Sequence, residues 1–254
     1  MLANMAIANI DAELANEIAN IKDTISQGSG NKIKVLPTGS FELPDGLDLG
    51  DEIQVVVVDF VSHNKFYATP YNPQNPTPPD CYAMGRKLND MAPEDDSPNK
   101  QNDDCRTCPL NQFGSGNGGR GKACKNSRVL AVLLVDQENP DAHNAPDAPL
   151  YVLELPPTAL RSFDGAVGHI ARALNGPPVK AILTVSAKNA GTYALITFSD
   201  PVPNPDYAAN VGRRPEVEDL LFRKPDFAAF EAKQASAPRG RANAARKPAA
   251  GARR

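Results

Sequence analysis

The sequence predicts a mainly β fold with flanking helices, and three observations lead to that prediction. Long runs of β-branched residues, at 53–61, 128–135 and 179–186, have the composition of sheet strands. The chain holds 24 prolines and 18 glycines in 254 residues, which favours many loops and short elements. Helical spacing of apolar residues is confined to a few segments. We therefore expect a small Greek-key barrel, with an open α+β sandwich as the alternative.

The first 30 residues are predicted to form a separate amphipathic helix over 4–27. Apolar side chains recur there every three or four residues, which places them on one helical face, and glycines at 28 and 30 end the pattern. These apolar residues are Ile7, Ile10, Leu14, Ile18, Ile21 and Ile25. The stripe is expected either to dock on its own domain or to mediate self-association.

Residues 31–200 are predicted to hold the β domain. A first strand at 32–36 is followed by a turn at Leu43–Gly46, where proline fixes φ and glycine accepts a positive φ. The run at 53–61 is the expected central strand. A turn is then expected at His63–Asn64, before the sheet continues at 65–67.

The second half of the domain continues the series of strands and turns, after a polar insertion at about 81–126. Strands are expected at 128–135, 151–155, 179–186 and 192–198, a helix at 158–174, and a hairpin turn at Lys188–Gly191. About six or seven strands with one internal helix fit a barrel of the oligonucleotide-binding (OB) kind.

Two segments follow the β domain. Residues 201–234 are a predicted C-terminal extension with a short helix within 216–230, and 235–254 are predicted to be a disordered basic tail. From 231 onward seven basic residues face one acid, a net charge of +6 that leaves −9 on the rest of a chain whose total is −3. A basic tail on an acidic body is a common way to approach a polyanion, and it also serves solubility alone.

The hydropathy of the chain argues against a membrane or export role. No run of 18 apolar residues occurs, and the N-terminus lacks the basic-then-apolar pattern of an export signal. We therefore expect a cytoplasmic protein that has no membrane partner.

All four cysteines lie in the insertion, as Cys81, Cys105, Cys108 and Cys124 in a C-x23-C-x2-C-x15-C pattern. A C-x2-C turn directs two thiolates to one tetrahedral ion, so the pattern predicts a structural zinc with four cysteine ligands. A closed site of this kind leaves no position for catalytic water. An iron–sulfur cluster is the minor alternative, because Pro109 follows Cys108. Two disulfides or four free thiols are also compatible with the pattern. His63 and His143 are alternative ligands, or surface histidines.

A glycine-rich segment precedes the last cysteine. Gly116–Lys122 satisfies G-x-x-x-x-G-K, yet Ala123 follows where a phosphate loop needs Ser or Thr, and no strand-to-helix context is visible. We expect instead a flexible cationic loop that contacts phosphates or merely frames the metal. Its cations are Arg120, Lys122, Lys125 and Arg128.

Aromatic and basic residues also gather around the start of the insertion. Unpaired nucleic acid is held by bases stacked on rings and by cations along its backbone, which this combination provides. Alternation along a strand sends Phe66 and Tyr67 to opposite faces, so at most one of them is exposed there. The candidate contacts are Lys65, Phe66, Tyr67, Tyr71, Tyr82, Arg86 and Lys87.

Acidic residues in the insertion offer a catalytic alternative. Glu94–Asp96 and Asp103–Asp104 are runs that could bind a metal and serve a nuclease, although solvated acids are the simpler interpretation. Ser, His and Asp form no recognisable hydrolytic arrangement elsewhere. We therefore expect a binding protein and not an enzyme.

Three motifs resemble a group of tailed-phage proteins: Pro79–Gly85, Cys105–Ser115 and Gly121–Asn126. The arrangement also resembles, more loosely, the T4-type phage single-stranded DNA-binding (helix-destabilising) proteins, in which a metal-binding insertion interrupts an OB barrel. This resemblance implies a zinc role for the four cysteines. The chain departs from that pattern by offering four cysteines where the family uses three and a histidine, and by ending in a basic tail where the family has an acidic one.

The sequence thus predicts a single-stranded DNA-binding protein of phage replication or recombination, acting in the cytoplasm of a bacterial host. It would trap melted DNA by binding the single strand and not the duplex. Replication or recombination proteins are further expected partners. The first alternative is a zinc-stabilised accessory factor that binds a phage polymerase or recombinase, and the second is the metal-dependent nuclease.

Overall fold

The computed structural model describes residues 31–70, 77–199, 201–228 and 230. Three predictions fall outside these residues: the N-terminal helix at 4–27 with its self-association, Tyr71 in the proline-rich segment, and the basic tail at 235–254. They stay predictions.

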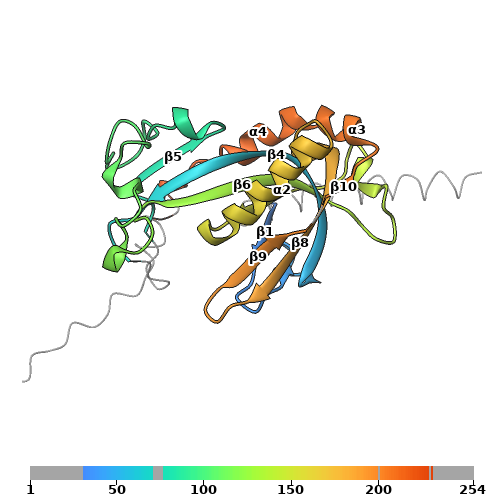
Figure 1. The fold of residues 1–254 in the computed structure, drawn as a ribbon, viewed down its shortest axis with the longest axis horizontal. Coiled ribbons are helices and arrows are strands. Elements are labelled where there is room, and N and C mark those ends of the chain that lie inside the picture. Colours follow the sequence, from blue (N-terminus) through green and yellow to red (C-terminus); the bar gives the residue numbers. More distant parts are fainter. Residues whose placement is uncertain (1–30, 71–76, 200, 229, 231–254) are drawn as a thin grey trace, which may run out of the picture.

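The described chain forms one mixed sheet of ten strands (Figure 1). The strands are β1 (Lys32–Val35), β2 (Phe41–Glu42), β3 (Asp48–Gly50), β4 (Glu52–Phe66), β5 (Cys81–Gly85), β6 (Lys125–Leu134), β7 (Leu150–Leu155), β8 (Ala181–Asn189), β9 (Ala194–Phe198) and β10 (Val202–Pro203). Their order is β10-β8-β4-β6-β7-β1-β2-β3, with β5 added to β4 and β9 added to β8. The pairing of β1 with β7 is parallel, and the other pairings are antiparallel.

The mainly β class with a few helices is confirmed, but a closed OB-like barrel is not. The order of paired strands ends at β3 on one side and β10 on the other, so the described sheet is open. Four short strands, β2, β3, β5 and β10, were not predicted, because two to five residues carry too little alternation to stand out.

Strand β4 is the longest of the described elements and the centre of the sheet (Figure 1). It pairs with β6 along most of its length, with β8 over Glu52–Val56 and with β5 over Ser62–Phe66. The predicted turn at His63–Asn64 is therefore wrong, because both residues pair on both sides within the strand. Their polar side chains are buried and bonded, and this tertiary bonding replaces the solvent that a turn would provide.

Alternation along the strands gives the sheet two apolar faces. On one face Val55, Val57 and Leu130 pack against helix α2 (Leu160–Ala173), which is the predicted internal helix. Phe163 of α2 meets Phe60 edge to face, with 5.1 Å between ring centroids. Figure 1 shows α2 crossing β4 and β6.

The opposite face is covered by the C-terminal extension. Helix α3 (Tyr207–Gly212), the 3₁₀ helix η7 (Arg214–Val217) and helix α4 (Glu218–Leu221) follow one another there. Val217 and Leu221 are fully buried against Val56, Val58 and Val129. The short helix predicted within 216–230 thus ends at Leu221, and α3 was not predicted. No helix in the described ranges is long and apolar enough to cross a membrane.

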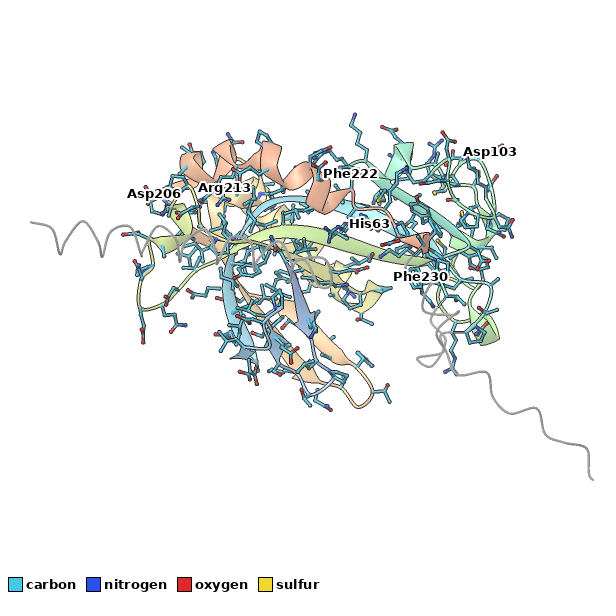
Figure 2. All side chains as sticks on the ribbon, turned by 180° about the vertical axis from the view of Figure 1, so that it is seen from behind. His63, Asp103, Asp206, Arg213, Phe222 and Phe230 are labelled. Atoms are coloured by element: carbon cyan, nitrogen blue, oxygen red, sulfur yellow. The ribbon has the colours of Figure 1, made fainter. Side chains whose placement is uncertain are left out.

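Polar contacts fasten this extension to the sheet. His63 Nε2 donates to the carbonyl oxygen of Leu221 over 2.8 Å. Figure 2 shows His63 on the sheet beneath the segment that carries Phe222. Arg86 is held between the carboxylates of Asp59 and Glu218. These contacts make the extension an integral layer of the domain.

We predict that His63 makes stability depend on pH near neutrality. Burial lowers its pKa below the ordinary value of 6.5, so the unfolded chain binds a proton more readily than the folded one. The free energy of unfolding should therefore fall as the pH drops below about 6.5. His63→Gln keeps a donor for Leu221 but does not titrate, and should lose less stability between about pH 7.5 and 5.5 in urea denaturation.

The matched control is His169→Gln. His169 lies exposed on α2, and this variant should keep the wild-type pH dependence. If His63→Gln loses as much stability on acidification as wild type does, His63 is not the titrating group.

Candidate functional site

The sheet register brings the two outer cysteines together at one end of β4. Cys81 begins β5 and pairs with Phe66, the last residue of β4. Cys124 directly precedes Lys125, which pairs with Lys65 from the other edge of β4. Two cysteines 43 positions apart therefore border the same strand end.

The inner pair lies in a loop that backbone and amide hydrogen bonds hold in place. The amide N–H of Cys105 donates to the carbonyl oxygen of Met91 over 3.0 Å, and the side chain of Asn111 donates to the carbonyl of Cys105 over 2.7 Å. The backbone N–H of Asn111 donates to Cys108, and that of Cys124 donates to Leu110. The C-x2-C loop is thereby fixed over the end of the sheet.

All four cysteines line one small cavity of about 20 Å³, which Phe66 and Asn64 also border. None is in a disulfide. As the side chains are placed, no group of three or more His, Cys, Asp or Glu in the described ranges could hold a metal ion. Side chains that line one cavity can still lie too far apart to bind the same ion. The cysteines thus converge without forming a coordination sphere.

The cavity suits neutral thiols as it stands. Burial raises the pKa of Cys124 to about 12, and the neighbouring cysteines add to the rise. Burial also raises the pKa of Cys105. Four sulfur donors are chemically appropriate for zinc, whose positive charge would favour thiolates. Neither His63 nor His143 lines this cavity, so the structure does not bring the alternative ligands to it.

A second feature, which we call the lysine groove, involves the same end of β4. It is an open groove of about 890 Å³ whose lining includes Lys32 and Lys34 of β1, Lys65 of β4, Lys125 of β6, and Tyr67 and Tyr193. The two tyrosines are 38% and 48% exposed, so their rings are accessible. The groove combines cations with exposed aromatic rings.

Glu154 of β7 lies in the lysine groove and is bonded to two of its lysines. The Nζ atoms of Lys32 and Lys65 each lie 2.8 Å from one of its carboxylate oxygens. Burial alone would raise the pKa of Glu154, but the two ammonium groups prevail and lower it to about 2. The carboxylate is therefore charged at neutral pH, and it reduces the repulsion between the lysines.

The structure gathers some of the predicted nucleic-acid contacts and separates others. Lys65, Tyr67 and Lys125 meet in the lysine groove. Tyr82 is buried and its hydroxyl donates to Asp96, so its ring is not available for stacking. Arg86 is occupied by its two carboxylate partners.

The remaining predicted contacts lie elsewhere around the insertion. Phe66 borders the cysteine cavity, Lys87 and Arg120 are exposed, and Lys122 donates to Asn111. Arg128 is buried. Sequence reasoning missed Lys32, Lys34 and Tyr193, although the alternation of Lys32 and Lys34 with apolar residues marks a strand with a cationic face.

The glycine-rich segment is a loop and not a phosphate loop. A Cβ at Gly116 would lie 2.1 Å from the carbonyl oxygen of Arg120, and Gly118, Gly119 and Gly121 have positive φ. The segment leads through Cys124 directly into β6, with no helix after it. Glycine is therefore required there by the tight path of the chain.

The acidic runs of the insertion are engaged in ion pairs. Asp95 binds Lys100, Asp104 binds Arg106, and Asp96 binds Lys224. The structure places no cluster of acids suited to a metal in the described residues. The geometry thus gives no support to the nuclease alternative.

Comparison with known proteins adds nothing to these observations. No family model, no curated protein and no solved structure matches this chain.

We predict that Glu154→Gln lowers the free energy of unfolding at pH 7 by about 2 kcal/mol, allowing for solvent screening. The pKa of Glu154 is lower in the folded chain, so its contribution is present above about pH 4.5 and is lost as the pH falls toward 2. Chemical denaturation of both proteins at neutral and acid pH measures the difference.

Glu42→Gln is the control, because Glu42 bonds one lysine, Lys34, and its side chain is 25% exposed against 26% for Glu154. It should cost less stability. A difference between wild type and Glu154→Gln that persists unchanged to about pH 2 contradicts the role given to the two lysines.

Proposed function

We propose that this chain binds single-stranded DNA through the lysine groove, in phage replication or recombination within a bacterial host. The observation that carries the proposal is the meeting of Lys32, Lys34, Lys65 and Lys125 with the exposed rings of Tyr67 and Tyr193. Bases stack on tyrosine rings, and ammonium groups follow the phosphates. An open sheet here takes the place of the closed OB-like barrel expected from the sequence.

Binding would act by shifting the melting equilibrium. A duplex keeps its bases stacked inside, so only an unpaired strand offers its bases to Tyr67 and Tyr193. Each stacked base contributes about 1–3 kcal/mol, so two rings with several phosphate contacts supply useful affinity. In this proposal the protein stabilises the melted state by binding alone, without a catalytic step.

The proposal includes a structural zinc ion held by Cys81, Cys105, Cys108 and Cys124. The four cysteines already face one cavity, and the ion would supply the charge that holds their thiolates together. The cavity and the lysine groove share the same end of β4, because Lys65 and Lys125 of the groove are sequence neighbours of Phe66 and Cys124 of the cavity. A bound ion would therefore fix the strand end from which Lys65 and Lys125 extend.

One observation favours the accessory-factor alternative. Phe113, in the insertion, is 85% exposed, and Leu88 is 53% exposed. Apolar side chains displayed in this way suit contact with another protein. A failure to bind single strands at low salt would favour this alternative over the first proposal.

We predict that the purified chain carries one zinc ion, measured by elemental analysis. Cys108→Ser should lose most of the metal and make the insertion more sensitive to limited proteolysis. Visible absorbance distinguishes an iron–sulfur cluster.

His63→Gln and His143→Gln serve as controls, because neither histidine lines the cysteine cavity, and both should retain the metal. A folded protein with no metal, and with Cys108→Ser behaving as wild type, would remove zinc from the proposal.

We predict that affinity for oligo-dT falls steeply between about 50 and 200 mM salt, measured by fluorescence anisotropy. Lys125→Met should reduce the slope of log K against log salt by about 0.7, the value for one phosphate contact on a single strand. Tyr67→Ala and Tyr193→Ala should each cost about 1–3 kcal/mol of binding.

Two controls match these variants. Arg172→Met removes an exposed cation of α2, and Tyr207→Ala removes a ring that is 39% exposed, close to the 38% of Tyr67. Neither residue lines the lysine groove, so neither change should alter binding. If the groove variants and the control variants lose the same amount of oligo-dT affinity, the lysine groove is not the binding surface.

A further inference from the structure

The α2 side of the sheet changes from apolar to polar where it passes beneath the insertion. Leu130 and Val132 of β6 belong to the apolar core, whereas Arg128 and Asn126 continue the same face of the strand. Each polar residue faces another on β4, because Arg128 pairs with Ser62 and Asn126 with Asn64. A pocket of about 330 Å³ opens over this patch, and we call it the amide pocket.

Arg128, which lines the amide pocket, is a buried cation with little to bind. The residue is 6% exposed. Its ion-pair partner among the described residues is the exposed carboxylate of Asp164, 3.6 Å from the guanidinium. No Arg128 nitrogen is among the buried side-chain atoms of the described residues that lack a hydrogen-bond partner, so its unbonded N–H groups open onto the pocket. Holding a guanidinium largely out of solvent costs free energy, and an apolar residue at this position would avoid that cost. A charged residue at a position where the strand pattern calls for an apolar one is typical of a binding site.

The pocket offers an acceptor beside this donor. The Asn126 amide nitrogen donates to Asn64 over 2.6 Å and to Asn111 over 3.0 Å. The Oδ1 atom of Asn126 then has no hydrogen bond to any described residue, and it is left to accept one. Arg106 and Lys122 add cations at the insertion side, where Arg106 is paired with Asp104.

Apolar side chains complete the walls. Leu88 and Leu160 both line the amide pocket, and Leu88 is 53% exposed. A phosphate group would need neither apolar walls nor an acceptor. A planar ring with acceptors and donors on its edge uses the guanidinium, the amide oxygen and the leucines together. The lining therefore fits a nucleobase better than a phosphate.

We propose that the amide pocket binds one unpaired guanine of the single strand. The Arg128 guanidinium would donate to O6 and N7, which is the common pairing of arginine with guanine, and Asn126 Oδ1 would accept from the ring N–H edge. This inference rests on the proposed function, because it gives the bound single strand a base preference. It makes the protein prefer strands with an accessible guanine over uniform thymine.

The test compares two labelled single strands of about 12 nucleotides, all thymine or with one central guanine, in fluorescence anisotropy with the full-length protein. Wild type should bind the guanine strand about tenfold more tightly. Arg128→Met should bring the two affinities to within about twofold. Arg161→Met removes an exposed α2 arginine outside the amide pocket, and it should keep the preference.

Leu88→Ala tests the same pocket from an exposed wall, so the result does not depend on the folding of Arg128→Met. It should reduce the preference severalfold. Equal binding of both strands by wild type overturns the guanine pocket and leaves the proposed function standing. Binding of neither strand removes the proposed function and the pocket with it. A preference that survives both Arg128→Met and Leu88→Ala shows that another site reads the base.

Discussion

The pairing of β4 on both of its edges is the constraint on which the rest of the structure depends. Its first half is a run of buried valines between two apolar layers, and its second half is the meeting point of β5 and β6. Cys81 and Cys124 reach one cavity, and Lys65 and Lys125 reach one groove, because their strands pair with the same strand end. The core thus sets the geometry of every candidate site residue on these strands.

The second half of β4 is polar and buried, and this combination ties the layers together. Buried polar groups need partners, and those of β4 find them in segments distant in sequence. His63 bonds to Leu221 in the C-terminal extension, and Asn64 accepts from Asn126, which also bonds Asn111 of the insertion. Displacing the extension or the insertion would expose or orphan these groups. The site-bearing loop is therefore coupled energetically to the sheet.

The elements that were predicted correctly are those whose structure is set by residues close together in the sequence. The α2 helix follows from its spacing of apolar residues, and the β8–β9 hairpin from Gly191, which has a φ of 92°. The turn at His63–Asn64 failed because polarity suggested solvent, whereas Leu221 and Asn126 supply the bonding from elsewhere. Lys32 joins the groove only through parallel pairing with β7, 120 residues away at Val152. No local pattern carries that information.

The acidic charge of the whole chain does not prevent the lysine groove from attracting a polyanion. At physiological salt the Debye length is about 8 Å, so a strand in the groove responds chiefly to charges within that distance. The lining holds four lysines and Glu154, and Lys34 is also paired with Glu42. The two carboxylates weaken the local positive field by two charges, yet Glu154 holds Lys32 and Lys65 in fixed positions at 2.8 Å. A lysine that is already held in position loses less conformational entropy on binding a phosphate than a mobile one does. Glu154 therefore weakens the electrostatic attraction of the groove for a strand but lowers the entropy cost of each phosphate contact.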